Sequence, residues 1–160
     1  MGESDREPGY TRIAADADVL AADLLCGGAA RDALDQLRRH SWLSLVVTEP
    51  LLDDAEAVIA SLADAKLAAD WRETVEPWSL VVEQPSGDHP GLAAAYRGRA
   101  AHLLSMDERL LSAKAGADLG RRMTVSVRSP DAFATVFDPE ALYESLFEEP
   151  YAGPDRDPWA

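Results

Sequence analysis

Short apolar segments alternate with amphipathic segments along most of this 160-residue chain, and no other feature restricts the possible folds as strongly. The strand-length runs are apolar, whereas the longer segments between them repeat apolar residues at helical spacing. The expected strands cover residues 12–17, 42–47, 78–84, 101–105 and 122–127. The expected helices cover residues 27–40, 50–71, 91–100, 107–114, 129–137 and 138–149. Alternating strands and helices predict an α/β fold, here a three-layer α/β/α sandwich around a mainly parallel sheet.

Composition favours a single domain with one core. Hydrophobic residues make up 47% of the chain, so we expect one domain over 12–150, a flexible tail over 1–11 and a loose tail over 151–160. No apolar run reaches the length of about 18 residues that crosses a membrane, and the polar start does not resemble a secretory signal. The one cysteine, Cys26, excludes an intramolecular disulfide and a CxxC metal site. These features predict a cytoplasmic protein.

The charge is strongly negative, and the acids are spread along the chain. Acidic residues number 29 against 15 lysines and arginines, so the net charge is −14. Lysine is rare, since only Lys66 and Lys114 occur. This composition indicates an organism adapted to high salt, and an ordinary acidic protein is the alternative. At molar salt the screening length is about 3 Å, so net negative charge does not exclude a nucleic-acid substrate.

Acidic residues stand where the predicted strands pass into helices. Ligands of open parallel sheets bind beyond the carboxyl ends of the strands, so these acids are candidate site residues. They are Asp16, Asp18, Asp54, Asp88 and Asp107. In an extended backbone Asp16 and Asp18 would point to the same face. Taken singly, an aspartate at a helix start is more commonly a cap or a solvated first-turn residue.

Together, such acids would repel one another at one crevice, and a divalent cation would compensate that repulsion. The candidate ligands are all oxygen atoms, and the three histidines do not have the spacing of metal ligands. Hard oxygen ligands favour Mg²⁺ or Mn²⁺ over zinc.

Four segments of the chain resemble the PIN domain family, the fold of many metal-dependent ribonucleases. They are "DADVLAADLLCGGAARDALDQL", "LVVTEPLLDDAEAVI", "SGDHPGLAAAYRGRAAHLLSMDERLL" and "VSVRSPDAF", and the resemblance spans roughly residues 12 to 137. The matching positions are Asp16, Asp54 (six residues after Thr48), Asp88, Ser105 and Asp107. Three positions depart from the family pattern. Asp54 replaces the usual Glu, Met106 the usual Gly, and Asp18 a common Asn.

The resemblance implies hydrolysis of RNA phosphodiester bonds by water. Asp16, Asp88 and Asp107 would hold one or two Mg²⁺ or Mn²⁺ ions, and Asp54 would complete the acidic cluster. Ser105 would hydrogen-bond a carboxylate or a water at the metal, and Asp18 would orient a ligand. Small PIN proteins are commonly toxins, which implies a homodimer or a small antitoxin protein as partner. No membrane partner is expected.

Arginines near these segments are candidates for gripping RNA phosphates. They are Arg31, Arg97, Arg99 and Arg109. The alternative for each is an ion pair with one of the abundant acids on a helix surface.

Other functions stay open at this point. A PIN-like module that binds RNA or protein without efficient cleavage is one alternative. A haloacid-dehalogenase-type phosphatase also begins with Asp-x-Asp, but it requires a late Lys and a further acid near position 111, which is Leu111. A phosphoacceptor receiver domain expects a Lys after the last strand, where Arg128 stands.

Overall fold

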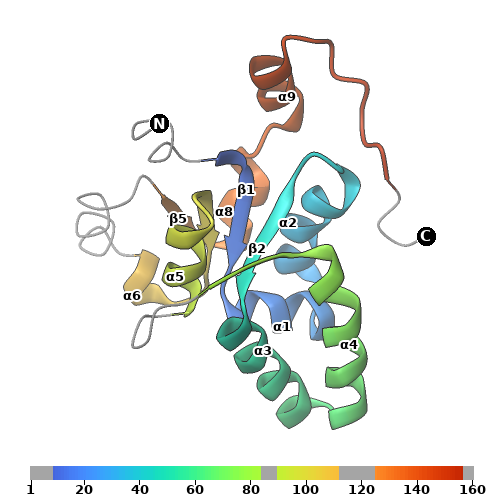
Figure 1. Ribbon diagram of the computed structural model, residues 1–160, viewed down its shortest axis with the longest axis vertical. Helices are drawn as coiled ribbons and strands as arrows, with labels where there is room; N and C mark the ends of the chain where they lie inside the picture. The colour runs from blue at the N-terminus through green and yellow to red at the C-terminus, as the bar shows by residue number, and fades with distance from the viewer. Residues whose placement is uncertain (1–8, 84–89, 112–124, 157–160) are drawn as a thin grey trace.

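The computed structural model describes residues 9–83, 90–111 and 125–156, and a parallel sheet lies at its centre. Five strands pair in the order β3-β2-β1-β4-β5, and all four pairings are parallel (Figure 1). The strands are β1 (Gly9–Ala15), β2 (Ser44–Thr48), β3 (Leu80–Val82), β4 (Ala100–Leu104) and β5 (Ser126–Arg128). The predicted α/β fold with a parallel sheet is therefore confirmed.

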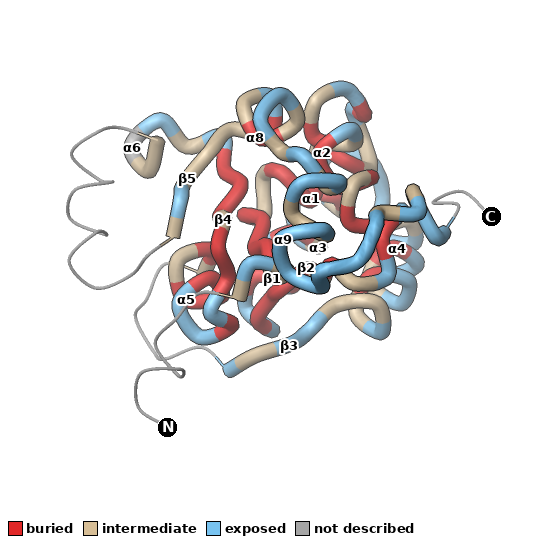
Figure 2. The backbone as a smooth tube through the Cα atoms, turned by 90° about the horizontal axis from the view of Figure 1, so that it is seen from above, coloured by how far each residue is buried: buried red, intermediate tan, exposed pale blue. Residues whose placement is uncertain are grey.

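Helices cover both faces of the sheet, as a three-layer sandwich requires. Helix α5 packs on strands β1, β2 and β4 on one face, whereas α2 and α8 pack together on the other (Figures 1 and 2). The helices are α1 (Ala17–Leu25), α2 (Gly28–Arg39), α3 (Glu49–Leu62), α4 (Ala65–Trp78), α5 (Pro90–Arg97), α6 (Glu108–Leu111), α8 (Pro130–Val136) and α9 (Pro139–Phe147). Within the described ranges, none of them is both long and apolar enough to cross a membrane.

The central strands are buried on both faces. In β1, Ile13, Ala14 and Ala15 are fully buried, and in β2 the run from Leu45 to Thr48 is buried without interruption. Continuous burial of this kind is typical of parallel strands covered by helices on both sides. Phe133 of α8 is also fully buried, and it closes the core against the sheet.

Two predictions about the helices are wrong for local reasons: one expected helix is divided, and one helix was not expected. The single helix expected over 50–71 is two helices, because the Asp64 side chain accepts a hydrogen bond from the backbone N–H of Leu67 (2.7 Å) and starts α4. Helix α1 was not expected, and it begins directly after Asp16. By contrast, the helices predicted over 129–137 and 138–149 do form as α8 and α9, and the side chains of Ser129 and Asp138 cap their starts.

The C-terminal residues 151–156 are held against the end of α2, and helix α9 stands off the sheet (Figure 1). The Asp155 carboxylate accepts a hydrogen bond from the backbone N–H of Ser41 (2.7 Å), and Arg156 donates to the His40 carbonyl (3.0 Å). The Ser41 hydrogen bonds lower the pKa of Asp155. These contacts tie residues 155 and 156, within the tail predicted to be loose, to the end of α2.

We expect Tyr151→Phe to destabilise the protein. Buried His40 faces the Gln36 carbonyl with Nδ1 (2.7 Å), so Nδ1 carries the proton and Nε2 accepts from the Tyr151 hydroxyl (2.6 Å). Without that hydroxyl a buried acceptor loses its partner, which costs about 1–3 kcal/mol of the free energy of unfolding. Urea denaturation measures this cost.

Tyr143→Phe is the matched control, because the Tyr143 hydroxyl makes only a long, exposed hydrogen bond to Glu149 (3.4 Å). We expect this variant to stay within about 0.5 kcal/mol of the wild type. Equal effects of the two substitutions would contradict the role given to Tyr151.

Candidate functional site

The candidate site lies at the carboxyl edge of the sheet, the edge where the strands end. The chain places β2 and β3 on one side of β1, and β4 and β5 on the other. This reversal of strand order between β1 and β4 is the place where open α/β sheets bind ligands. In Figure 1 it lies at the lower end of the strands, beside α1 and α3.

Polar side chains at this edge begin the helices that follow the strands. Asp16 accepts a hydrogen bond from the N–H of Ala17 (2.9 Å), and Thr48 accepts from the N–H of Leu51 (3.1 Å). Ser129 caps α8 in the same way. Capping is therefore one role of these residues, as expected for short polar side chains at helix starts.

A buried serine joins two of the predicted acids. The Ser105 hydroxyl donates to Asp16 Oδ2 (3.1 Å) and accepts from the backbone N–H of Asp107 (3.0 Å). Ser105 is fully buried, and Asp16 is 8% exposed. The backbone reinforces this arrangement, since the Asp16 N–H donates to the Leu104 carbonyl (2.8 Å). The structure thus brings Asp16, Ser105 and Asp107 together, as the sequence predicts.

Asp18 also belongs to this group, but not through an extended backbone. It lies in the first turn of α1, and its Oδ2 accepts from the backbone N–H of Met106 (3.3 Å). Its Oδ1 is buried and has no hydrogen-bond partner among the described residues. Burial raises the pKa of Asp18, and the negative charges of Asp16 and Asp107 raise it further. We call Asp16, Asp18 and Asp107 the acidic cluster.

The acidic cluster has the chemistry of a hard-cation site. The Asp18 Oδ1 atom is an unsatisfied acceptor beside other carboxylates, and a divalent cation would satisfy it and offset their repulsion. In the part of the chain that the structure describes, no three carboxylate, His or Cys side chains lie close enough to hold one ion. Magnesium fits such a site, because it keeps several waters and needs only one or two carboxylates.

Among the described residues, no hydrogen bond or ion pair joins Asp54 to the acidic cluster, so its role there stays a prediction. Its side chain is exposed on α3, whereas the inward-facing positions of that helix are Leu51, Leu52 and Ala55. The helical period decides the outcome, because it turns position 54 away from the sheet. Asp88 lies outside the described residues, so its placement as a metal ligand stays a prediction.

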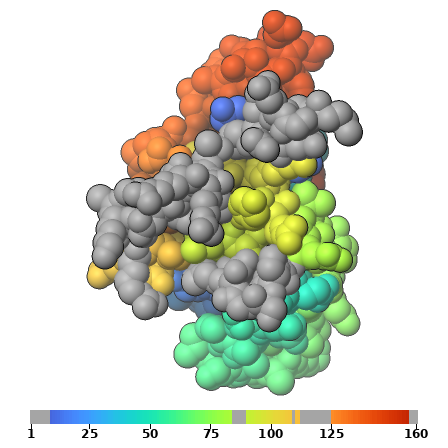
Figure 3. All heavy atoms as spheres, turned by 60° about the vertical axis from the view of Figure 1, so that its left-hand side comes forward, coloured from blue at the N-terminus to red at the C-terminus, as the bar shows by residue number. Residues whose placement is uncertain are grey.

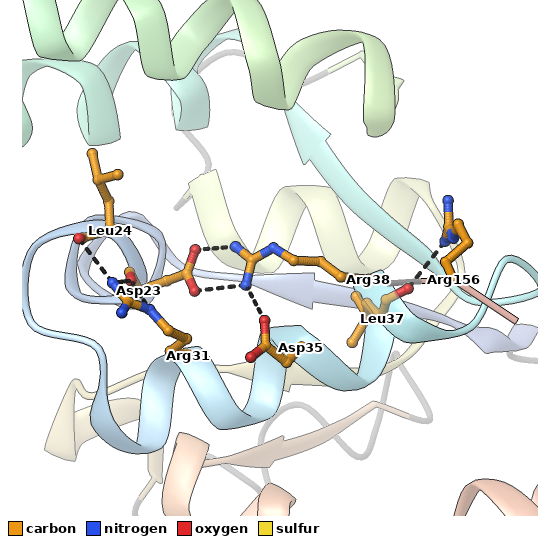
Figure 4. Close-up of polar contacts among 7 residues, drawn as sticks. All are labelled: Asp23, Leu24, Arg31, Asp35, Leu37, Arg38 and Arg156. Atoms are coloured by element: carbon orange, nitrogen blue, oxygen red, sulfur yellow. Dashed lines mark hydrogen bonds and ion pairs between the residues drawn. The ribbon is translucent and has the colours of Figure 1, made fainter. Parts of the chain in front are cut away.

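Three of the four predicted RNA-binding arginines lie away from the cluster, and the side chain of the fourth, Arg109, is not among the described parts of the structure. Arg31 donates to the Asp23 and Leu24 carbonyls at the end of α1 (Figure 4). Arg97 ends α5 and Arg99 directly precedes β4, so both lie at the opposite, amino edge, where the N–H of Gly9 donates to the Arg99 carbonyl (2.6 Å). In Figure 3, α5 lies at the surface between the α3–α4 pair and the C-terminal helices. Arg109 lies in α6, two residues after Asp107.

Sequence reasoning did not select Thr48 or Arg128 as site residues. Thr48 is buried at the end of β2, and the Arg128 carbonyl accepts from the N–H of Ser105 (3.0 Å). The sequence did contain a signal for the residues at this edge. A polar residue stands at or directly after the end of four apolar strand segments. Those residues are Asp16, Thr48, Ser105 and Ser129.

We expect Asp18→Asn to stabilise the protein at neutral pH. Because the folded state raises the pKa of Asp18, its ionisation lowers the free energy of unfolding as pH rises. The variant should therefore gain up to about 1 kcal/mol at pH 7, a modest value because Asp18 is only half-buried and water screens the repulsion. The gain should vanish below the ordinary pKa of 3.8, where the carboxyl is protonated in both states.

Urea denaturation at several pH values measures the difference, with Asp54→Asn as the control for an exposed aspartate. The control should stay within about 0.5 kcal/mol of the wild type throughout. A stability loss in Asp18→Asn at pH 7 would contradict the repulsion described here.

Comparison with protein-family models gives one match, to a family of unknown function (DUF7384), and this match covers residues 7–159. Comparison with curated proteins gives no match. The geometry of the site is therefore the main source for a functional conclusion.

Proposed function

The chain belongs to the family of unknown function DUF7384, and we propose from its site that it is a metal-dependent ribonuclease with a PIN-like domain. The observation that carries the proposal is the buried link through Ser105 between Asp16 and Asp107. That link lies where the strand order reverses, and it joins two of the acids that the PIN resemblance implies.

Each residue of the cluster has a distinct role in this proposal. Asp16 and Asp107 would hold Mg²⁺ or Mn²⁺, and Asp88 is the further ligand that the resemblance implies. Ser105 positions both acids, because its hydroxyl is fixed by a donated and an accepted hydrogen bond. Asp18 would orient a ligand with its unsatisfied Oδ1. When bound, the cation activates water and neutralises charge that develops on the phosphate.

The local environment suits hydrolysis of an anionic substrate only with a cation present. Three carboxylates would repel a phosphodiester, and the pKa of Asp18 is raised by burial first and then by the charges of Asp16 and Asp107. A bound divalent cation makes the local electrostatic potential at the cluster positive, so that it attracts the phosphodiester. Strict metal dependence is therefore the signature that we expect.

One observation favours a second candidate, a PIN-like module that binds RNA and cleaves it weakly. Leu51 and Leu52 occupy the inward positions of α3, and Asp54 points to solvent. The cluster among the described residues therefore has no acid from α3. A dimeric state, an antitoxin partner and a cytoplasmic location belong to the same proposal.

The test is cleavage of a labelled structured RNA in molar KCl, the condition that the acidic composition indicates. We expect cleavage with Mn²⁺ and with Mg²⁺ and none with EDTA, because the carboxylates alone cannot stabilise charge on the phosphate. Gel analysis of the products measures the rate. Intact RNA in every condition, with no Mn²⁺ binding by calorimetry at the same salt, would contradict the nuclease and favour the binding module.

A further inference from the structure

Arg128 lacks the partner that every comparable arginine has. Four other arginine side chains in the described ranges are half-buried, and each donates to a carbonyl or carboxylate oxygen; they are Arg12, Arg31, Arg38 and Arg72. Arg128 is half-buried as well, but its side chain donates no hydrogen bond to a described residue. Its Nε is buried without a partner, as is that of Arg72, whose Nε however lies 3.5 Å from Glu76 Oε2. No described acid forms an ion pair with it, although the chain has 29 acidic residues.

Arg128 lies next to the acidic cluster. It is the last residue of β5 and pairs with Leu104, the last residue of β4. Its carbonyl accepts from the N–H of Ser105, the residue that links Asp16 to Asp107 (3.0 Å). Neighbouring strands are about 4.8 Å apart, so the Arg128 backbone is one strand spacing from the end of β4.

A second unsatisfied nitrogen shares this face of the sheet. His102 pairs with Ser126, two residues before Arg128, so His102 and Arg128 lie on the same face. The ring of Phe133 packs edge-on against His102 (5.3 Å), which identifies this as the α8 face. His102 Nδ1 is buried without a hydrogen-bond partner in the described part of the chain. Burial, and then the charge of Arg128, lower the pKa of His102, so Arg128 is the cation of this pair at neutral pH.

A half-buried guanidinium without a counter-ion is costly, and its chemistry indicates what would satisfy it. Burying an unpaired charge or an unbonded N–H costs free energy, so native proteins rarely retain one. Arginine presents several N–H donors in a planar fork that matches the oxygens of a phosphate group. A phosphate group is thus a natural partner for the guanidinium of Arg128.

We infer that Arg128 binds a phosphate of the RNA strand, adjacent to the phosphodiester at the acidic cluster. Arg128 lies one strand away from the end of β4, where the acidic cluster begins. It would therefore bind a neighbouring phosphate and not the one that is cleaved. The RNA would then run across the carboxyl ends of β1, β4 and β5, with His102 beside the bound phosphate. This inference rests on the proposed function, because it assigns RNA as the ligand of this edge.

The test compares RNA binding by the full chain, its R128Q and R128K variants and the control R39Q. Arg39 is exposed at the end of α2, on the amino side of β2, so R39Q removes the same charge far from the cluster. Fluorescence anisotropy of a labelled RNA oligomer in EDTA, at fixed KCl, measures affinity without cleavage. We expect R128Q to weaken binding about tenfold and to reduce the salt dependence by about one phosphate contact, with R39Q within about twofold of the wild type. R128K should fall between, because it keeps the charge and loses the fork.

An NMR titration with inorganic phosphate tests the same contact without RNA. The Arg128 Nε–H signal, assigned by its loss in R128K, should shift with phosphate. The titration uses the wild-type protein, so it tests the inference even if R128Q fails to fold. An Arg128 signal that does not shift with phosphate would overturn the inference. A phosphate-dependent shift with unchanged RNA affinity in R128Q would also overturn it, because the site would then serve a free anion.

The outcomes separate this inference from the nuclease proposal. Weakened RNA binding in R128Q, in a protein that cleaves no RNA with any metal, would uphold the phosphate contact and reject the nuclease. Wild-type affinity in R128Q, in a protein that does cleave RNA, would uphold the nuclease and reject the contact.

Discussion

Asp16→Asn is expected to lower the rate of metal-dependent RNA cleavage by about 100-fold or more. Asp16 is buried at the reversal of strand order, and the Ser105 hydroxyl donates a hydrogen bond to it. The position of its carboxylate is therefore fixed. Removing one preorganised electrostatic group from an active site commonly costs about 100- to 1000-fold in rate. The measurement is the single-turnover cleavage rate with saturating Mn²⁺.

The substitution separates catalysis from folding, because asparagine caps a helix as well as aspartate does. Its side-chain oxygen can still accept from the N–H of Ala17, so we expect the free energy of unfolding to change by less than about 1 kcal/mol.

Asp32→Asn is the matched control for the loss of a carboxylate. It should keep the wild-type cleavage rate within about twofold, since Asp32 is exposed on α2 and is not a candidate site residue. Equal loss of cleavage in both variants would show that the cluster is not the site, and an unchanged rate in Asp16→Asn would reject Asp16 as a metal ligand.

Arg38→Leu is expected to lower the free energy of unfolding by about 3–5 kcal/mol. Arg38 donates to the carboxylates of Asp23 (2.8 Å) and Asp35 (2.8 Å), which are 5% and 6% exposed (Figure 4). It also lies over the ring of Trp78, 5.7 Å from the centroid. Without Arg38, two buried carboxylates between α1 and α2 lose their cation, and breaking a buried ion pair from one side costs this much.

Urea denaturation at constant KCl measures the loss, and Lys66→Met is its control. Lys66 and Asp70 form an exposed pair, with side chains 84% and 58% exposed, so that substitution should cost less than about 0.5 kcal/mol. Arg38→Lys should lie between, because lysine keeps the charge and loses the fork. A loss below about 1 kcal/mol in Arg38→Leu would contradict the role of this ion-pair network.

The Arg38 network also shows what sequence reasoning can and cannot decide about the arginines. The sequence selects Arg31 as a candidate for RNA and gives no signal for the ion pairs of Arg38, although both lie in one amphipathic helix. The structure ties Arg31 to carbonyls of α1 and Arg38 to buried acids. Asp23 and Leu24 belong to α1, a helix that the pattern of the sequence did not predict, whereas Asp35 lies in α2 itself.

The sequence by itself determined the order of strands and helices, the parallel sheet and the polar residues where strands end. These depend on local properties, namely the period of apolar residues and the capping preference of Ser, Thr and Asp. Asp16 and Asp107 were found this way, because each follows an apolar strand and parallel strands share one carboxyl edge, whereas Ser105 was selected only by the PIN resemblance.

Only the tertiary structure decided which side chains meet. The direction of α5 carries Arg97 to the amino edge, and the helical turn of α3 carries Asp54 to solvent. The pairing of β5 with β4 brings Arg128 beside Ser105, residues that are far apart in the chain. Such contacts depend on the directions and pairing of whole elements, which a local pattern of residues does not contain.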